Sequence, residues 1–130
     1  MVIDTSAIAA ILFGESEGER LAHAVAADAT RLMSSFTALE CAIVVEARKG
    51  EAGARELDLL LHRADVRIVA LDSDQVELAR NAWRHYGKGR HAAGLNVGDC
   101  CAYALAQTSG EPLLFKGGDF AQTDVTAVPY

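Results

Sequence analysis

The sequence has few cysteines and no long apolar run, and so lacks the features that are typical of small secreted and membrane-spanning proteins. Its 130 residues include only three cysteines, two prolines and one tryptophan. An odd cysteine count without CxxC or paired Cys/His spacing argues against a disulfide framework and a zinc site, so we expect buried thiols at Cys41, Cys100 and Cys101. No apolar run approaches the roughly 20 residues that a membrane-spanning helix needs. Asp4 interrupts the apolar start, which is not typical of a secretory signal, and we expect a cytoplasmic protein.

Basic residues are also scarce. The chain has 12 lysines and arginines against 18 aspartates and glutamates, which gives a formal net charge of −6. This balance argues against the uniformly basic surface of many nucleic-acid-binding domains. The stretch 80–91, RNAWRHYGKGRH, is an exception because it contains no acidic residue. The sequence therefore predicts a local basic patch on an acidic protein.

Hydrophobic residues make up 51% of the chain, and they fall into short apolar runs and longer segments with helical spacing. The predicted strands are 2–4, 31–35, 66–71 and 112–116, with 125–130 as a further candidate. The predicted helices are 6–13, 17–27, 37–49, 52–64, 74–86 and 99–108. Short apolar strands that alternate with helices are typical of a parallel sheet covered on both faces. We predict a single α/β domain over 1–130, a three-layer α/β/α sandwich with a short central parallel sheet.

Four acidic residues stand where predicted strands end or predicted helices begin. They are Asp4, Glu40, Asp99 and Asp119. Ligands of open parallel sheets bind beyond the carboxyl ends of the strands. We therefore expect these four carboxylates to gather at one crevice.

Each of these acids also has a structural explanation that the sequence leaves open. Asp4 and Asp99 suit the N-termini of helices. Thr37-Ala-Leu-Glu40 matches a capping box, and Asp119 stands beside two glycines, as turn residues do. Taken together, however, several carboxylates in one crevice repel one another unless protons or a cation relieve the repulsion.

Oxygen ligands without soft donors favour Mg²⁺ or Mn²⁺. Such a cation lowers the pKa of a bound water and stabilises the charge that develops during phosphodiester hydrolysis. A carboxylate that does not bind the cation can accept the proton of that water. The acidic residues therefore indicate metal-dependent hydrolysis of a phosphodiester, without choosing between RNA and DNA.

The basic stretch suggests where a nucleic acid would bind. Arg80, Arg84 and Lys88 are spaced i, i+4, i+8, so we expect them on one stripe of the helix 74–86, with Arg90 in the following loop. These four cations are the candidate residues for binding the phosphates of a nucleic acid. A solvated helix face is the alternative. An aromatic residue here can stack on a base, but we expect Trp83 to pack in the core.

Four segments, in this order and at this spacing, resemble the PIN-domain ribonucleases of the VapC toxin type. The segments are MVIDTSAIAAIL, TALECAIVVEAR, NVGDCCAYALAQTSGEPLLFKGGDF and AQTD, and they cover nearly the whole chain. The resemblance implies a PIN-like fold and a Mg²⁺- or Mn²⁺-dependent endoribonuclease. Such enzymes act as the toxin of a bacterial toxin–antitoxin pair.

The resemblance also implies roles for individual residues. The catalytic acids would be Asp4, Glu40, Asp99 and Asp119, of which Asp4, Asp99 and Glu40 would bind the metal. Supporting hydroxyl groups would come from Thr5, Ser6 and Thr123. The implied partners are an RNA substrate, a second copy of the chain in a homodimer, and a VapB-type antitoxin that lies across an apolar groove.

Two alternatives remain open at this stage. A receiver-type phospho-switch also combines an α/β sandwich with an acidic Mg²⁺ pocket, but it needs an aspartate at the end of a mid-chain strand. Asp58 lies inside a predicted helix instead. A catalytically inactive PIN-like module that only binds a partner is the second alternative. The apolar segments AIAAILF and CAIVVEA are candidates for self-association or antitoxin binding, or are ordinary core helices.

Overall fold

Four short parallel strands form the centre of the protein. The computed structural model describes residues 1–130, with β1 (Val2–Ile3), β2 (Leu32–Ser34), β3 (Arg67–Val69) and β4 (Leu113–Leu114) in the order β3-β2-β1-β4. All three strand pairs are parallel, and Val2 lies opposite both Leu32 and Leu113. The four predicted strands are confirmed. Segment 125–130 adds only a single bridge, between Ala127 and Leu113.

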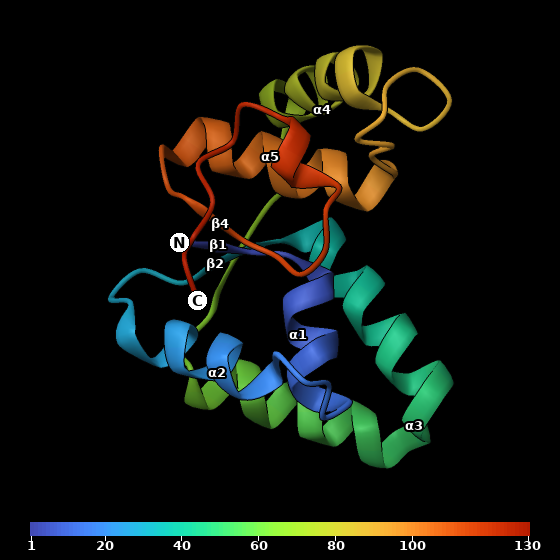
Figure 1. Ribbon diagram of the computed structural model, residues 1–130. Coiled ribbons are helices and arrows are strands. Elements are labelled where there is room, and N and C mark those ends of the chain that lie inside the picture. The colour runs from blue at the N-terminus through green and yellow to red at the C-terminus, as the bar shows by residue number, and fades with distance from the viewer.

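Helices cover both faces of this sheet (Figure 1). They are α1 (Thr5–Leu12), α2 (Gly18–Ala27), α3 (Ser35–Arg63), α4 (Ser73–Tyr86) and α5 (Val97–Ser109), and a 3₁₀ turn, η1, spans Phe120–Gln122. Helices α4 and α5 lie on one face, and α1, α2 and α3 lie on the other. None of these helices is both long and apolar enough to span a membrane.

Neighbouring residues of β1, β2 and β4 point into two different cores. Val2, Leu32 and Leu113 pack with α5, whereas Ile3, Met33 and Leu114 pack with α1, α2 and α3. A strand that is buried on both faces needs an apolar residue at every position, which explains the short apolar runs of the sequence. The predicted three-layer sandwich is confirmed, and the three cysteines are free and buried, as expected.

The long helix α3 consists of two segments. Gly50 interrupts it with a φ of 64° and a ψ of −161°, a conformation that is open to glycine at little cost. The chain turns there, so that the second segment runs back beneath α1 and α2 (Figure 1). The two predicted helices on either side of Gly50 are therefore present, but the first one begins at Ser35 rather than at Thr37.

Candidate active site at the carboxyl edge of the sheet

Asp4 directly follows the central strand and is only 3% exposed. Its Oδ2 accepts hydrogen bonds from the Ser6 backbone N–H at 2.9 Å and from the Ser6 hydroxyl at 2.6 Å, so Asp4 also caps α1. Burial raises the pKa of Asp4, the bonds from Ser6 lower it, and the charge of Glu40 raises it. The other oxygen, Oδ1, is buried without a hydrogen-bond partner. An unpartnered buried oxygen is costly, which makes this atom a candidate cation ligand.

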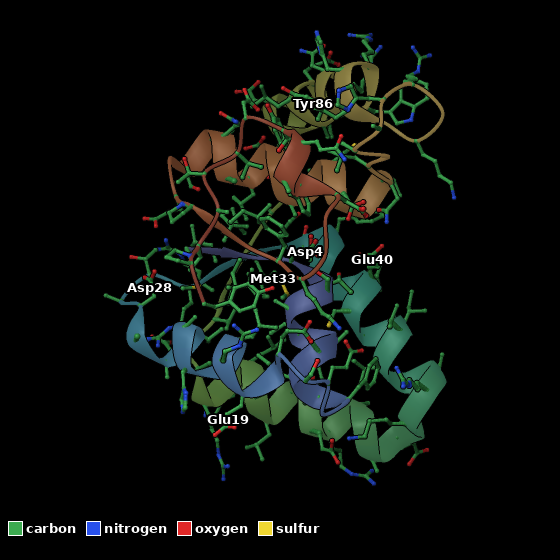
Figure 2. All side chains as sticks on the ribbon, viewed as in Figure 1. Asp4, Glu19, Asp28, Met33, Glu40 and Tyr86 are labelled. Carbon is green, nitrogen blue, oxygen red and sulfur yellow. The ribbon has the colours of Figure 1, made fainter.

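Glu40 lies in the second turn of α3, close to Asp4 (Figure 2). The capping box considered for it does not form, because α3 already begins at Ser35 and the buried Thr37 hydroxyl has no partner. Instead, the Thr5 hydroxyl donates a hydrogen bond of 2.7 Å to Glu40 Oε2. On its other side the carboxylate lies against Gly98, where an added Cβ would stand 2.7 Å from Glu40 Cδ. Contacts from α1 and α5 therefore fix this carboxylate.

Asp99 is a buried acid in the first turn of α5, with 9% of its surface exposed. It forms a capping box with Asn96: the Asp99 N–H donates to Asn96 Oδ1 at 3.0 Å, and the Asn96 N–H donates to Asp99 Oδ2 at 2.8 Å. Burial is the main reason why the pKa of Asp99 rises to about 7, opposed by the hydrogen bond from the Asn96 backbone. The charges of Asp4, Asp119 and Glu40 raise it further, so all four acids share one electrostatic environment.

Asp119 is the exposed member of the four acids and begins η1 without a side-chain capping bond. Its loop is held by two contacts. The rings of Phe115 and Phe120 pack with their centroids 5.0 Å apart, and the Tyr103 hydroxyl donates a 2.7 Å hydrogen bond to Asp124. Tyr103 stands one helical turn after Asp99 on α5. Helix α5 therefore carries one acid and anchors the loop of another.

The three candidate hydroxyl residues differ in what they contact. Thr5 donates to Glu40, and Ser6 donates to Asp4 while its oxygen accepts the Lys116 N–H at 3.0 Å. Thr123 touches none of the acids. Its hydroxyl donates to the Phe120 carbonyl and accepts from the Val125 N–H, so it closes the turn that follows Asp119.

The donor set fits a small hard cation. As the side chains lie, no three His, Cys, Asp or Glu groups converge into a ready metal cage. Mg²⁺, however, keeps several waters and needs only one or two carboxylates. Besides Asp4 Oδ1, the buried hydroxyls of Ser34, at the end of β2, and of Thr37 lack partners. Asp4 follows β1, Ser34 ends β2, and Thr37 lies in the first turn of α3, which follows β2. Water or a hydrated cation at this edge of the sheet would satisfy these oxygens.

The basic patch is arranged differently from the predicted stripe. Helix α4 ends at Tyr86, and Gly87 is extended and bridges to Leu95, so Lys88 lies beyond the helix. Lys88 makes no ion pair, whereas Arg80 pairs with Glu77 and Arg84 donates to Asn81. The Arg90 guanidinium lies 4.0 Å from the centroid of the Trp83 ring.

Two aromatic side chains near the patch have different environments. Trp83 is 43% exposed, so the prediction of a core position was wrong. Tyr86 is half-buried and packs against the rings of Tyr103 and His91. Trp83, rather than Tyr86, is therefore the aromatic surface available to a ligand.

Comparison with known proteins identifies the family. The model of the PIN domain matches residues 1–125. The chain is 62% identical to Ribonuclease VapC of Mycolicibacterium smegmatis, over 98% of this chain and 99% of that protein. It is 60% identical to Ribonuclease VapC30 of Mycobacterium tuberculosis, over 98% of both chains. The chain belongs to the VapC family of PIN-domain proteins. The resemblance of the four sequence segments is thereby confirmed.

Solved structures of other VapC-family and toxin proteins share this fold. A structure of Mycobacterium tuberculosis VapC20, described as a toxin that cleaves the sarcin-ricin loop, has a TM-score of 0.80 at 18% identity and covers 98% of this chain and 97% of its own. A toxin-antitoxin complex from Klebsiella pneumoniae has a TM-score of 0.75 at 18% identity, covering 99% and 97%. At this identity the likeness concerns the fold, and it leaves the receiver-type alternative without support.

Some features of this VapC-family site could not be found in the sequence. Gly98 and the Tyr103–Asp124 pair act through contacts between distant segments, and no local spacing marks them. Asn96, in contrast, could have been found in the sequence, because an asparagine three residues before an aspartate at the start of a helix is a capping signal.

Proposed function

We propose that this VapC-family protein is a divalent-metal-dependent endoribonuclease and the toxin of a toxin–antitoxin pair. One observation carries the proposal: four carboxylates from four segments of the chain lie close enough to interact. The charges of Asp4, Glu40 and Asp119 all raise the pKa of Asp99. The ribonuclease names of relatives that are 60–62% identical over nearly the full chain support it. We propose that the protein acts in the cytoplasm, where it would meet its RNA substrate.

Mg²⁺ or Mn²⁺ is the proposed cofactor, held by Asp4, Asp99 and Glu40. When bound, the metal supplies an activated water and stabilises charge on the phosphate. The protein positions the ligands: Ser6 orients Asp4, Thr5 and Gly98 fix Glu40, and the cap fixes Asp99. The carboxylate of Asp119 is exposed and makes no capping hydrogen bond, so it is free to accept the proton of a bound water, and we assign it the role of base.

The proposed RNA contacts are the cations of the basic patch, namely Arg80, Arg84, Lys88 and Arg90. All four are exposed. They lie along α4 and the segment that leads to α5, whose first turn carries Asp99. Cations in this position would hold the phosphates of a strand that enters the acidic crevice.

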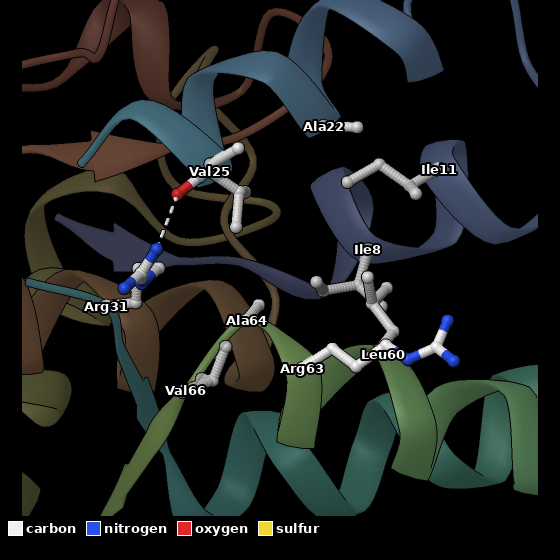
Figure 3. Close-up of a pocket in the computed structure, with 10 residues that line it drawn as sticks. Ile8, Ile11, Ala22, Val25, Arg31, Leu60, Arg63, Ala64 and Val66 are labelled. Atoms are coloured by element: carbon white, nitrogen blue, oxygen red, sulfur yellow. Dashed lines mark hydrogen bonds between the residues drawn. The ribbon is translucent and has the colours of Figure 1, made fainter. Parts of the chain in front are cut away.

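The proposed antitoxin site is an apolar hollow of about 350 Å³ between α1, α2 and the end of α3 (Figure 3). Ile8, Ile11 and Leu60 line it, together with two arginines. Arg31 donates to the Val25 carbonyl, but its buried Nε has no partner, and Arg63 is exposed. This lining would suit an amphipathic segment that carries acidic side chains.

The proposed homodimer would cover exposed apolar side chains on the first segment of α3. Leu39 is 60% exposed, Ile43 is 61% exposed and Val44 is 39% exposed. These residues belong to the segment that contains CAIVVEA. The other apolar segment, AIAAILF, has Ala7, Ile8 and Ala10 buried and its other residues half-buried, so it contributes to the core instead.

Mapping of RNA ends in cells tests the proposed function. The chain is expressed from an inducible promoter, and new RNA ends are compared with those produced by Asp4→Ala. We expect a defined set of new ends and arrested growth with the wild-type chain only, both suppressed by co-expression of a small protein encoded beside it. Identical RNA ends in both strains would contradict the activity, and would favour the inactive binding module.

A further inference from the structure

A second apolar cavity, of about 630 Å³, lies between α4, α5 and the start of α3. Its wall is largely hydrophobic and includes Phe36, Leu71, Val76, Trp83, Leu95 and Val97. Its volume falls within the range of small-ligand pockets. A cavity of this size has room for one nucleobase with its sugar.

The cavity adjoins residues that hold two of the four acids. Asn96, whose side chain caps Asp99, and Cys100, the residue after Asp99, both line it. Gly98, against which the Glu40 carboxylate lies, follows the lining residue Val97. A group bound in the cavity would therefore lie close to a phosphodiester bond positioned at Asp99 and Glu40.

The rim of the cavity is cationic. Arg80 and Lys88 both line it, and Lys88 has no acidic partner. The surrounding stretch, 80–91, contains no acidic residue although the chain as a whole carries a net charge of −6. This concentration of cations complements a polyanion.

Large apolar side chains are exposed around the same cavity. Trp83 is 43% exposed, Val97 63% and Val76 39%. The Arg90 guanidinium lies over the Trp83 ring, and this cation–π contact holds the two side chains beside each other. A flat ligand with apolar faces and attached phosphates would bury these side chains and use the cations on the rim.

We propose that this cavity receives an unpaired nucleobase of the RNA substrate, stacked on Trp83, while adjacent phosphates bind Arg80 and Lys88. The proposal rests on the proposed ribonuclease function and names its substrate class: RNA whose base next to the cleaved bond is free to leave a helix, as in a loop or a single strand. Arg80 already pairs with Glu77, but a purely apolar peptide segment would leave Lys88 on the rim without an anionic partner.

Tryptophan fluorescence tests the proposal directly, because Trp83 is the only tryptophan of the chain. Full-length protein in excess chelator, which prevents cleavage, is titrated with a short single-stranded RNA. We expect saturable quenching by this RNA, and little quenching by a duplex of the same sequence or by a strand with abasic positions. The quenching should match binding measured with a labelled strand.

Variants measured with the labelled strand provide the second readout. Trp83→Ala should weaken binding roughly tenfold, whereas Trp83→Phe, which keeps a stacking surface, should stay within about threefold of wild type. Lys88→Glu should weaken binding and reduce its salt dependence. Equal affinities of Trp83→Ala and Trp83→Phe would overturn the assigned stacking.

The outcomes separate this proposal from the proposed function. A protein that cleaves RNA, and binds it without quenching Trp83, would retain the ribonuclease function and lose the base pocket. A fluorescence change that depends on protein concentration or on added antitoxin, but not on RNA, would assign the cavity to a protein interface and overturn the proposal. Absence of both RNA binding and cleavage would overturn the ribonuclease function itself.

Discussion

Asp99 shows how the site depends on the environment of a single residue. Burial, with added contributions from neighbouring acids, raises its pKa from 3.8 to about 7. The folded protein therefore holds this proton at a higher pH than the unfolded chain does. A raised pKa in the folded state stabilises the protein below the unfolded pKa, and this stabilisation is lost as the pH rises through the folded pKa.

We expect the free energy of unfolding of the metal-free protein to fall between about pH 4 and pH 7, by up to about 4 kcal/mol for a shift of about three pKa units. Asp99→Asn, which cannot ionise, should flatten this slope. Denaturant unfolding in chelator at several pH values measures both proteins. Added Mn²⁺ should restore stability near pH 7 in the wild-type protein only. Parallel pH profiles for the two proteins would contradict the assigned environment of Asp99.

The positions of Asp4, Asp99 and Asp119 were predictable because each stands at an element boundary. Asp4 follows an apolar run and Asp99 follows a helix-start signal, and both patterns are local. The exposure of Trp83 was not predictable, because an aromatic residue at helical spacing packs in a core or stays exposed depending on which helices lie beside it. The neighbours of Glu40 likewise come from α1 and α5.

At the scale of elements, the approach of α5 to α3 depends on the absence of a side chain at Gly98. An added Cβ would meet the Glu40 carboxylate, which sits at the end of a flexible side chain. Gly98→Ala should therefore displace the carboxylate rather than the backbone. Because alanine is favoured over glycine in helices by up to about 1 kcal/mol, stability should be unchanged or slightly higher.

Activity of Gly98→Ala should nevertheless fall by about tenfold or more, the usual effect of disturbing groups that orient metal ligands. Thermal unfolding and RNA cleavage are measured on the same preparation. Gly118→Ala is the matched control, because an added Cβ there meets nothing within 4 Å. Wild-type activity in a folded Gly98→Ala protein would show that the position of the Glu40 carboxylate is not important.

Helix ends were predicted less well than helix positions. Helix α3 begins at Ser35, two residues before its predicted start, whereas α4 ends at Tyr86, as predicted. The extended Gly87 pairs with Leu95, eight residues later, and this bridge removes Lys88 from the expected stripe. The break at Gly50 was predictable, since glycine readily adopts the positive φ found there.

At the scale of the whole molecule, the alternation of short apolar strands with helices was enough to predict the sandwich, because only a sheet covered on both faces buries such strands. Which apolar helix faces stay exposed was not predictable. Ile43 and Val45 are close in the same apolar segment, yet Ile43 is 61% exposed and Val45 is fully buried. The tertiary position of α3 decides between them.

The exposed apolar side chains on the first segment of α3 lead us to predict a dimer in solution. Ile43→Lys places a charge within the proposed dimer interface and should reduce the mass in solution from that of two chains to one. Leu59→Lys, at a position 47% exposed on the second segment of α3, is the control and should remain a dimer. Light scattering over a range of concentrations measures the mass. A monomeric wild-type protein at every concentration would contradict the proposed homodimer.

The central claim is that the four acids Asp4, Glu40, Asp99 and Asp119 form a metal-dependent ribonuclease site. Its most direct measurement is the initial rate of RNA cleavage by purified wild-type, Asp4→Asn and Asp58→Asn proteins, in chelator and after Mg²⁺ or Mn²⁺ is restored. Asp58 is an exposed residue of α3 and serves as the matched control. We predict metal-dependent cleavage by wild type and Asp58→Asn, and a loss of about 100-fold or more in folded Asp4→Asn. Cleavage by folded Asp4→Asn at the wild-type rate, or full activity in chelator, would contradict the claim.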